Sequence, residues 1–328
     1  MATVSTYSVN PTGIGTGAVR ENLEDIIYNI SPTMTPFMSN VGRGNADSSY
    51  FEWQTDTLDA ANGSNAAWEG QDAVDTSFTK ANRVGNYTQI SQKTINVTGT
   101  SGAVDSAGMK TIEAYLLAKR GRELKRDMET ILTSNQAAVV GDASSVARKL
   151  AGLPAWITTN VVTNGVTTAP TLSSSPNGYP NTNWTLTSGA AYATVASLQS
   201  ALQKIWTNGG EPRMVMVGPV QKVKYSSFAG IAINRVNIDA AKQTFIVGAA
   251  DVFVSDFGNV DIVPNRFSPE AFSLFVDPEY AKVVYLRPFQ RNPLAKTGDS
   301  RRTPLLVEYT LQVNTEKAHG AIVNQLTT

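Results

Sequence analysis

The side chains that most often carry catalysis are scarce in this sequence of 328 residues. It contains one histidine, His319, in a polar segment near the C-terminus, and no cysteine. Catalytic triads, proton shuttles and most zinc sites use histidine, and thiolate nucleophiles, thiolate metal sites and disulfides require cysteine. The sequence therefore argues against a hydrolase, a metalloenzyme and a disulfide-linked fold, while carboxylate chemistry remains open.

Two short motifs match nucleotide-binding signatures without the surroundings that such signatures need. Gly13, Gly15 and Ala18 fit G-x-G-x-x-A, but no buried strand precedes them and no strand–helix–strand unit follows. Asp256-Phe257-Gly258 fits the kinase D-F-G motif, but the chain lacks V-A-I-K, H-R-D and a glycine-rich phosphate loop. We expect a hairpin turn there. The sequence thus predicts no catalytic residue, no cofactor and no metal.

Composition limits the class of protein further. Lys plus Arg and Asp plus Glu both number 27, so the net charge of zero gives no general attraction to nucleic acid. No apolar run approaches the ~20 residues of a membrane span, and Met1–Asn10 lacks the regions of a signal peptide. The length suits about two domains. We therefore expect a soluble protein that is stabilised by packing and association.

The elements that would position any site are dominated by one long helical pattern from Ser106 to Val140. Asp105 or Ser106 would cap its start, and Gly141 would follow its end. An apolar row at helical spacing predicts that one side faces a core, and about 1.5 Å per residue gives a length of roughly 50 Å. Many charges lie on the remaining surface. They indicate either an ordinary solvated face or partners outside the helix.

A second pattern, of period two, runs from Tyr50 to Thr98. Phe51 and Trp53 alternate with polar residues, and a return run begins at Tyr87. These runs predict a long two-stranded arm with a polar stretch between its strands. Such an arm is marginal alone and gives Trp53 and Trp68 little cover. We expect a neighbouring subunit to cover it, although folding back on its own domain would fit the same pattern.

The rest of the chain predicts a mixture of short helices and strands. Residues 150–203 contain no Asp, Glu, Lys or Arg, and their middle is rich in turn residues, which favours surface loops. Helical spacing predicts helices at Val19–Ile30, Ala190–Trp206 and Pro219–Phe228. Strands are predicted at Met214–Val217, Asp251–Ser255, Val260–Val263, Lys282–Leu286 and Leu305–Val313. The fold class is therefore α+β.

Several segments together resemble a known family over nearly the whole chain. They are residues 19–42, 50–58, 68–73, 86–100, 122–132, 251–267 and 291–324. In their order and spacing they resemble the major capsid (major head) proteins of tailed bacteriophages with the Hong Kong 97-like fold, in the branch found in some short-tailed phages. No single segment is as specific as a zinc motif.

The resemblance implies a division of the chain into the parts of that fold. These are an N-terminal arm (1–49), an extended β-hairpin loop (50–104), a peripheral domain with the long spine helix (105–157 and 291–328), a low-charge loop or insertion (158–189) and an axial domain (190–290). It also implies that the extended loop lies over an adjacent subunit.

The function implied is self-assembly into an icosahedral head shell that encloses the phage DNA genome, without enzymatic activity. The implied partners are copies of the chain in hexamers and pentamers, packaged double-stranded DNA bound non-specifically, and portal, scaffolding and possible cement proteins, with no membrane. The protein would belong to the virion and assemble in the host cytoplasm. Our candidates for contacts between subunits are Trp53, Trp68, Glu69, Arg83, Arg122, Glu123, Arg126, Asp127 and Glu129.

Two other classes of protein remain as alternatives. The tryptophans, the Asn/Thr-rich surface and the carboxylates would suit a carbohydrate-active enzyme or binding module, which needs two carboxylates about 5 to 10 Å apart in a cleft. A phage tail or adhesion protein would form trimers or fibres instead of shells. Particle size in negative-stain images separates these classes.

Overall fold

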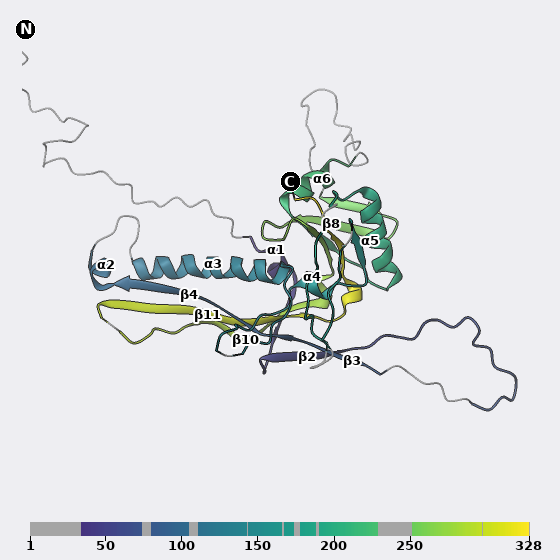
Figure 1. Cartoon of the computed structure of the whole chain (residues 1–328), viewed down its shortest axis with the longest axis horizontal. Coiled ribbons are helices and arrows are strands. Elements are labelled where there is room, and N and C mark those ends of the chain that lie inside the picture. Colours follow the sequence, from purple (N-terminus) through teal and green to yellow (C-terminus); the bar gives the residue numbers. More distant parts are fainter. Residues whose placement is uncertain are drawn as a thin grey trace, which may run out of the picture.

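Two β-sheets that share an apolar core, a separate two-stranded sheet and flanking helices form the described part of the chain (Figure 1). The computed structural model describes residues 34–73, 80–104, 111–142, 144–165, 167–173, 178–187, 190–228, 251–296 and 298–327. The helices are α1 (Pro36–Asn40), α2 (Gly99–Ala103), α3 (Ile112–Thr133), α4 (Leu153–Trp156), α5 (Val195–Thr207) and α6 (Pro219–Ser226). The strands are β1 (Gly42–Asn45), β2 (Tyr50–Thr55), β3 (Asn82–Tyr87), β4 (Gln89–Thr98), β5 (Val161–Thr163), β6 (Met214–Val217), β7 (Val252–Ser255), β8 (Gly258–Pro264), β9 (Phe272–Val276), β10 (Ala281–Arg291), β11 (Ser300–Val313) and β12 (Gly320–Val323).

The first sheet has four strands in the order β1-β10-β11-β4, and the long helix α3 runs beside β4 and β11 (Figure 1). Leu124, Met128 and Leu132 of α3 are fully buried, and they belong to the same core as Val307 and Leu311 of β11. The predicted apolar row thus faces the sheet, as a helix with one apolar stripe must.

Helix α3 is shorter than the predicted helix from Ser106 to Val140. It begins after the extended residue Thr111, and the predicted caps Asp105 and Ser106 lie outside the described residues. It ends at Thr133, whose hydroxyl donates to the carbonyl of Glu129 at 2.9 Å. The following residues instead form a narrow ribbon, in which Val139 pairs with Lys149. Gly141, with φ of 76°, lies in the ribbon's turn rather than behind the helix.

The second sheet has six strands in the order β5-β12-β9-β6-β8-β7. Leu198, Leu202 and Ile205 of α5 and Tyr225 of α6 pack into a second apolar cluster, whose sheet residues include Phe275. The β7–β8 hairpin confirms the predicted turn at the D-F-G motif, with Gly258 at φ of 122°. The prediction of β6 is confirmed with its ends, and those of α5, α6, β10 and β11 are confirmed with shifted ends, whereas Val19–Ile30 lies outside the described residues.

Strand pairing crosses two boundaries of the predicted domains, which themselves stay a prediction. Strand β10, assigned to the axial segment 190–290, pairs with β1 and β11 in the four-stranded sheet. Strand β12, assigned to the peripheral segment 291–328, pairs with β5 and β9 in the six-stranded sheet. The chain therefore crosses between the sheets near residues 277–281 and 313–320. Local patterns reveal a strand but not which distant strand pairs with it.

The segment 158–189 is also more integrated than a surface insertion. Its strand β5 forms the edge of the six-stranded sheet. Tyr179 and Trp184 are buried in the main core, and the indole N–H of Trp184 donates to the carbonyl of Pro154 at 2.9 Å. The segment lacks charged residues partly because Tyr179 and Trp184 are buried in the core. The prediction of exposed surface loops did not include this burial.

Candidate assembly arm and its anchor

A two-stranded hairpin projects from the body of the molecule (Figure 1). β2 pairs with β3 from Tyr50–Tyr87 to Thr55–Asn82, and the chain between them extends well past the sheets. The predicted return strand from Tyr87 to Thr98 is divided at Thr88. Up to Tyr87 the chain belongs to the hairpin, and from Gln89 it becomes β4 and pairs with β11. One continuous alternating pattern therefore serves two different sheets.

Aromatic contacts fix the base of this hairpin on the body of its own subunit. The Tyr50 and Tyr87 rings lie 4.6 Å apart, and the Tyr87 and Tyr179 rings lie 5.2 Å apart at nearly a right angle. The Trp53 ring lies 5.3 Å from that of Trp156, so Trp53 is partly covered within its own subunit, and its contact with a neighbour stays a prediction. Edge-to-face and tilted aromatic pairs of this kind stabilise beyond the area they bury.

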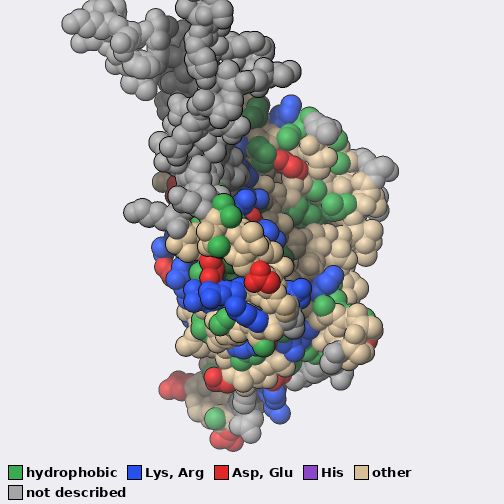
Figure 2. Space-filling model, turned by 90° about the vertical axis from the view of Figure 1, so that its left-hand side faces the viewer, with side chains coloured by type: hydrophobic (Ala, Val, Ile, Leu, Met, Phe, Trp, Pro, Cys, Tyr) green, Lys and Arg blue, Asp and Glu red, His purple; other side chains and the backbone are tan. Residues whose placement is uncertain are grey.

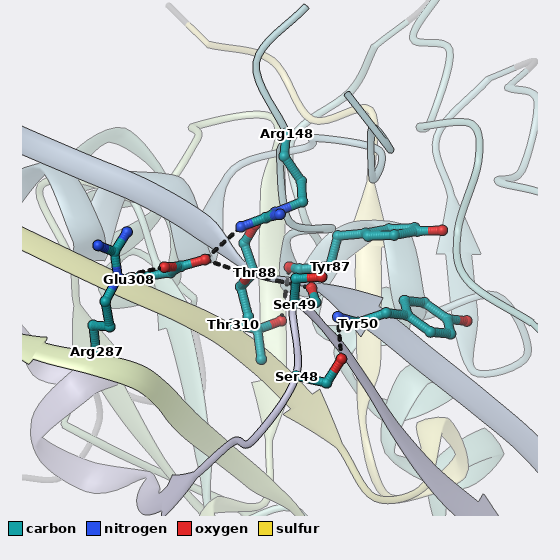
Figure 3. A network of polar contacts seen from close by, with 9 residues as sticks. All are labelled: Ser48, Ser49, Tyr50, Tyr87, Thr88, Arg148, Arg287, Glu308 and Thr310. Carbon is teal, nitrogen blue, oxygen red and sulfur yellow. Dashed lines mark hydrogen bonds and ion pairs between the residues drawn. The ribbon is translucent and has the colours of Figure 1, made fainter. Parts of the chain in front are cut away.

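A buried carboxylate holds the point where the hairpin joins the sheet (Figure 3). Glu308 of β11 has a side chain only 4% exposed and accepts from the Thr88 hydroxyl at 2.8 Å. It pairs with Arg287 at 2.7 Å and with Arg148 of the ribbon, whose Nε also donates to the Thr88 carbonyl at 2.7 Å. Thr88 also donates its backbone N–H to the carbonyl of Ser49 at 2.9 Å. The two ends of the hairpin therefore meet at Thr88, which is bonded to the carboxylate of Glu308.

The charge state of Glu308 follows from these partners. Burial acts to raise the pKa of this carboxyl, but the hydrogen bonds from Thr88 and Arg287 and the charges of Arg287 and Arg148 outweigh burial. The pKa of Glu308 is consequently lowered, and the group is ionised at neutral pH. A charged group that satisfies donors from three separate segments fixes their relative positions.

Beyond the paired strands, the arm exposes apolar groups and carries negative charge. The Leu58 side chain is 100% exposed and the Trp68 side chain 84% exposed. Between Asp56 and Ala73 there are four acidic residues and no Lys or Arg. Trp68 and Gln71 close a turn by mutual hydrogen bonds of 3.0 Å, and Gly70 supplies the positive φ of 81° that this turn needs. The arm tip is thus an acidic turn with an exposed tryptophan side chain.

Most of the other predicted contact residues find partners within the subunit or lie free at its surface. Arg83 lies 3.5 Å from Glu52 across the hairpin, Glu123 pairs with Arg120 at 2.5 Å, and Asp127 pairs with Lys93 at 2.7 Å. Arg126 lies over the Phe267 ring at 5.6 Å. Glu69 and Arg122 are exposed. The structure therefore leaves Trp68, Glu69 and Arg122 most available to a second copy.

Glu129 lies inside the subunit and does not fit the predicted set of contacts between subunits. It is fully buried, and its carboxylate accepts from the backbone N–H groups of Phe37 at 2.7 Å and Met38 at 3.0 Å. It also accepts from the Asn265 side chain at 2.8 Å. Burial raises the pKa of Glu129, and these hydrogen bonds oppose the rise. A side chain enclosed in this way has no surface to offer another subunit, since helical position alone does not reveal what covers it.

Other kinds of site find little support in the described residues. Within those ranges no group of three or more His, Cys, Asp or Glu side chains is arranged to hold a metal ion. In the same part of the chain, no helix combines the length and apolarity needed to cross a bilayer. His319, which the sequence placed in a polar tail, is fully buried, and its Nδ1 accepts from the Asp277 N–H at 3.3 Å.

Comparison with known proteins identifies the fold and the family. A family model described as the SU10 major capsid protein matches residues 9–326. The chain belongs to this family of major capsid proteins. A curated major capsid protein of Escherichia phage Phieco32 is 29% identical over 328 residues, covering 89% of this chain and 90% of that protein.

Solved capsids share the fold of this capsid protein. The Cyanophage A-1(L) capsid subunit has a TM-score of 0.68 at 13% identity, covering 95% of this chain and 98% of that chain. The capsid of a native GTA particle has a TM-score of 0.65 at 13% identity, covering 98% of this chain and 100% of that chain. The fold is therefore the Hong Kong 97-like fold of phage capsids, and the chain is a virion component that forms the phage head shell. The carbohydrate-active and tail-protein alternatives are wrong.

The residues that anchor the arm were missing from the sequence-based candidates for this capsid protein. Within the predicted strand Leu305–Val313, Glu308 and Thr310 are polar yet buried. The Thr310 hydroxyl donates to the Tyr87 carbonyl at 2.9 Å. Arg148 and Arg287 lie 160 and 21 residues from Glu308 in sequence. The only local signal is an acidic residue within an otherwise apolar run, which does not reveal its partners.

Proposed function

We propose that the projecting arm lies on a neighbouring subunit and thereby links subunits into the hexamers and pentamers of the head shell. The observation that supports this proposal is the exposed arm tip, where Leu58 and Trp68 have almost no cover within their own chain. An apolar surface of this kind, carried on a hairpin that cannot be stable alone, is typical of an interface. The subunit is a structural component without catalytic activity.

The base of the arm supports the same proposal. Glu308, Thr88 and the aromatic contacts hold the base of the hairpin in one direction, while the chain beyond β2 projects away from the body (Figure 1). A contact element that is held rigidly at its base loses less conformational entropy on binding than a flexible one. The orientation of the arm is thus fixed before the arm binds its neighbour.

Shortening the arm tests this function. Residues 56–81 would be replaced by Asn-Gly, a dipeptide suited to a two-residue hairpin turn, so that the Thr55–Asn82 pair and the anchor remain. We expect soluble subunits with an unchanged thermal unfolding midpoint that fail to form closed particles in negative-stain images. The full-length chain, purified and assembled in parallel, is the control. Closed shells of normal size from the shortened chain would refute the proposed role of the arm.

The remaining partners follow from membership in a shell that encloses a genome. We propose that the inner surface of the shell meets packaged double-stranded DNA without sequence preference, through backbone phosphates rather than base edges. Portal, scaffolding and cement proteins complete the proposed assembly, which takes place in the host cytoplasm. Purified shells assembled with and without scaffolding protein, compared for size uniformity, test the scaffolding requirement.

A further inference from the structure

Four Asn-Gly pairs occur in the sequence, beginning at Asn62, Asn164, Asn177 and Asn208. Asparagine before glycine is prone to spontaneous deamidation, because glycine has no side chain to keep its backbone nitrogen away from the asparagine side chain. The reaction also needs a backbone that can move and an amide group without strong partners. Asn177 lies outside the described residues, and the surroundings of the other three asparagines differ.

Asn208 is exposed but held in place at the end of α5. Its Nδ2 donates to the Asn160 side-chain oxygen at 2.7 Å and to the Lys204 carbonyl at 3.0 Å. The N–H of Gly209 donates to the Trp206 carbonyl at 2.9 Å, and Gly209 has the positive φ of 85° that ends many helices. The nitrogen that would attack and the amide that would leave are therefore both engaged.

Asn164 is restrained in a similar way at the end of β5. Its side-chain amide donates to the Ala191 carbonyl at 3.0 Å, and its backbone N–H donates to the Val323 carbonyl at 3.0 Å. Its own carbonyl accepts from the Asn324 side chain, and Gly165 has φ of 88°. The geometry of attack would break several of these bonds, so this pair is protected too.

Asn62 lies in the arm and lacks these restraints. It is exposed, and within the described ranges its Nδ2 donates to no acceptor. Gly63 does not have a positive φ, and a Cβ at this position would meet nothing within 4 Å. Neither turn geometry nor packing among the described residues therefore requires a glycine at position 63.

The one hydrogen bond at the Asn62 side chain favours the reaction. The N–H of Ser64 donates to Asn62 Oδ1 at 2.9 Å. When the nitrogen of Gly63 attacks Asn62 Cγ, negative charge develops on Oδ1. A donor already placed at that oxygen stabilises the charge, as the donors of an oxyanion hole do.

We propose that Asn62 is a site of spontaneous deamidation, which changes the charge and the backbone of the arm as unassembled subunits age. Water is the only co-reactant. A solvent base removes the Gly63 N–H proton, and the bond from this nitrogen to Asn62 Cγ forms. The bond from Cγ to Nδ2 then breaks as Nδ2 takes up a proton and leaves as ammonia. Water opens the resulting succinimide ring to aspartate or isoaspartate.

Either product alters the part of the arm that carries Trp68. Residues 56–73 already include four acidic residues and no Lys or Arg, and the product adds another negative charge. Isoaspartate also lengthens the backbone by a methylene group, which displaces Trp68 relative to the paired strands. Aged subunits should therefore assemble less well than fresh ones. This consequence rests on the proposed role of the arm, whereas the deamidation itself does not.

Mass spectrometry of peptides from stored subunits tests the site. Purified full-length subunits would be kept unassembled at neutral and at mildly alkaline pH in water enriched in heavy oxygen, and then digested. The Asn62 peptide should gain the mass difference between an amide and a carboxyl group, with heavy oxygen incorporated, at a rate that rises with hydroxide concentration. This rate should be at least about tenfold higher than at Asn208, whose hydrogen bonds must open first. Equal rates at the two sites would overturn the assignment.

Gly63→Ala gives an independent test with a matched control. The added Cβ obstructs the attack and should slow deamidation of Asn62 by at least about tenfold, without strain in the folded chain. Gly102→Ala also places a Cβ in open space but does not follow an asparagine, so it should leave the rate unchanged. Equal thermal unfolding midpoints show that both variants are folded. An unchanged rate in Gly63→Ala would contradict attack by the Gly63 nitrogen.

Assembly of aged subunits separates this inference from the proposed function. Stored natural subunits and the variant Asn62→Asp should give fewer closed shells than fresh natural subunits, and stored Gly63→Ala subunits should keep their yield. If the mass change appears but aged subunits assemble as well as fresh ones, the deamidation site is supported and its effect on assembly is refuted. If the shortened-arm chain forms normal shells, the role of the arm is refuted, while the mass change at Asn62 in the full chain still tests the site.

Discussion

At the scale of single residues, Glu308 is the group on which the arm base most depends. Its carboxylate joins Thr88, Arg148 and Arg287, so Glu308→Gln keeps the shape but leaves two guanidinium groups without their counter-ion. We expect this substitution to lower the free energy of unfolding by about 2 kcal/mol, less than for a fully buried pair because both arginines are partly exposed. Urea denaturation of unassembled subunits measures this change.

Glu279→Gln is the matched control for Glu308→Gln. Glu279 pairs with Arg213 at the surface, with both side chains more than half exposed, so its loss should cost at most about 0.5 kcal/mol. The loss of unfolding free energy in Glu308→Gln also depends on pH. Because the folded-state pKa of Glu308 is lowered, its contribution is present above the ordinary value of 4.5 and is lost as pH falls through the lowered pKa. Equal costs for the two variants at neutral pH would contradict the anchoring role.

His319 provides a second prediction at this scale. Complete burial lowers its pKa from 6.5 to about 4, so the folded chain keeps a neutral imidazole where the unfolded chain takes up a proton. The free energy of unfolding should therefore decrease as pH falls from 6.5 to 4, by up to about 3 kcal/mol from this residue. Asp277, whose pKa burial raises, contributes with the opposite sign. The comparison of wild type with His319→Gln, measured by denaturation at several pH values, isolates the histidine. Parallel pH profiles would show that His319 does not titrate in this way.

At the scale of elements, Glu129 joins α1, α3 and the loop after β8. Glu129→Ala leaves the N–H groups of Phe37 and Met38 and the amide of Asn265 without their acceptor. Buried donors without a partner cost about 1–3 kcal/mol each, reduced here because the burial of a charge is also relieved, so we expect a loss of about 3 kcal/mol. Hydrogen exchange at Phe37 and Met38 should accelerate more than in α3. Glu123→Ala, on the same helix but partly exposed, should leave both amides protected.

The sequence predicted those elements whose signals are local. The β6 strand and the β7–β8 turn follow from short apolar runs and turn residues, and they agree with the structure. The end of α3 was placed too late because the hydroxyls of Thr133 and Ser134 turn the chain into a ribbon before the helical pattern is exhausted. The division of the strand at Thr88 could not be predicted, since its partner Glu308 lies 220 residues away. The sequence therefore predicted the arm, whose pattern is local, but not the Glu308 anchor at its base, whose partners are distant in sequence.

At the scale of the whole molecule, a chain of zero net charge still carries unlike charges in different places. Residues 56–73 of the arm include four acidic residues and no Lys or Arg, whereas Figure 2 shows Lys and Arg side chains gathered at the end where α3 begins, so under the proposed role of the arm unlike charges of two copies would attract each other. Salt should weaken this attraction, because the Debye length falls from about 10 Å at 0.1 M to about 3 Å at 1 M. We expect the initial rate of shell assembly, followed by light scattering, to fall about tenfold over this range.

Subunit stability should respond much less to the same salt. The two cores are apolar, Glu308 pairs with arginines and Glu129 accepts hydrogen bonds inside the subunit, where salt screens interactions weakly. The thermal unfolding midpoint of unassembled subunits should thus stay nearly constant while the assembly rate falls. An assembly rate independent of salt would indicate that apolar contacts alone bring the subunits together.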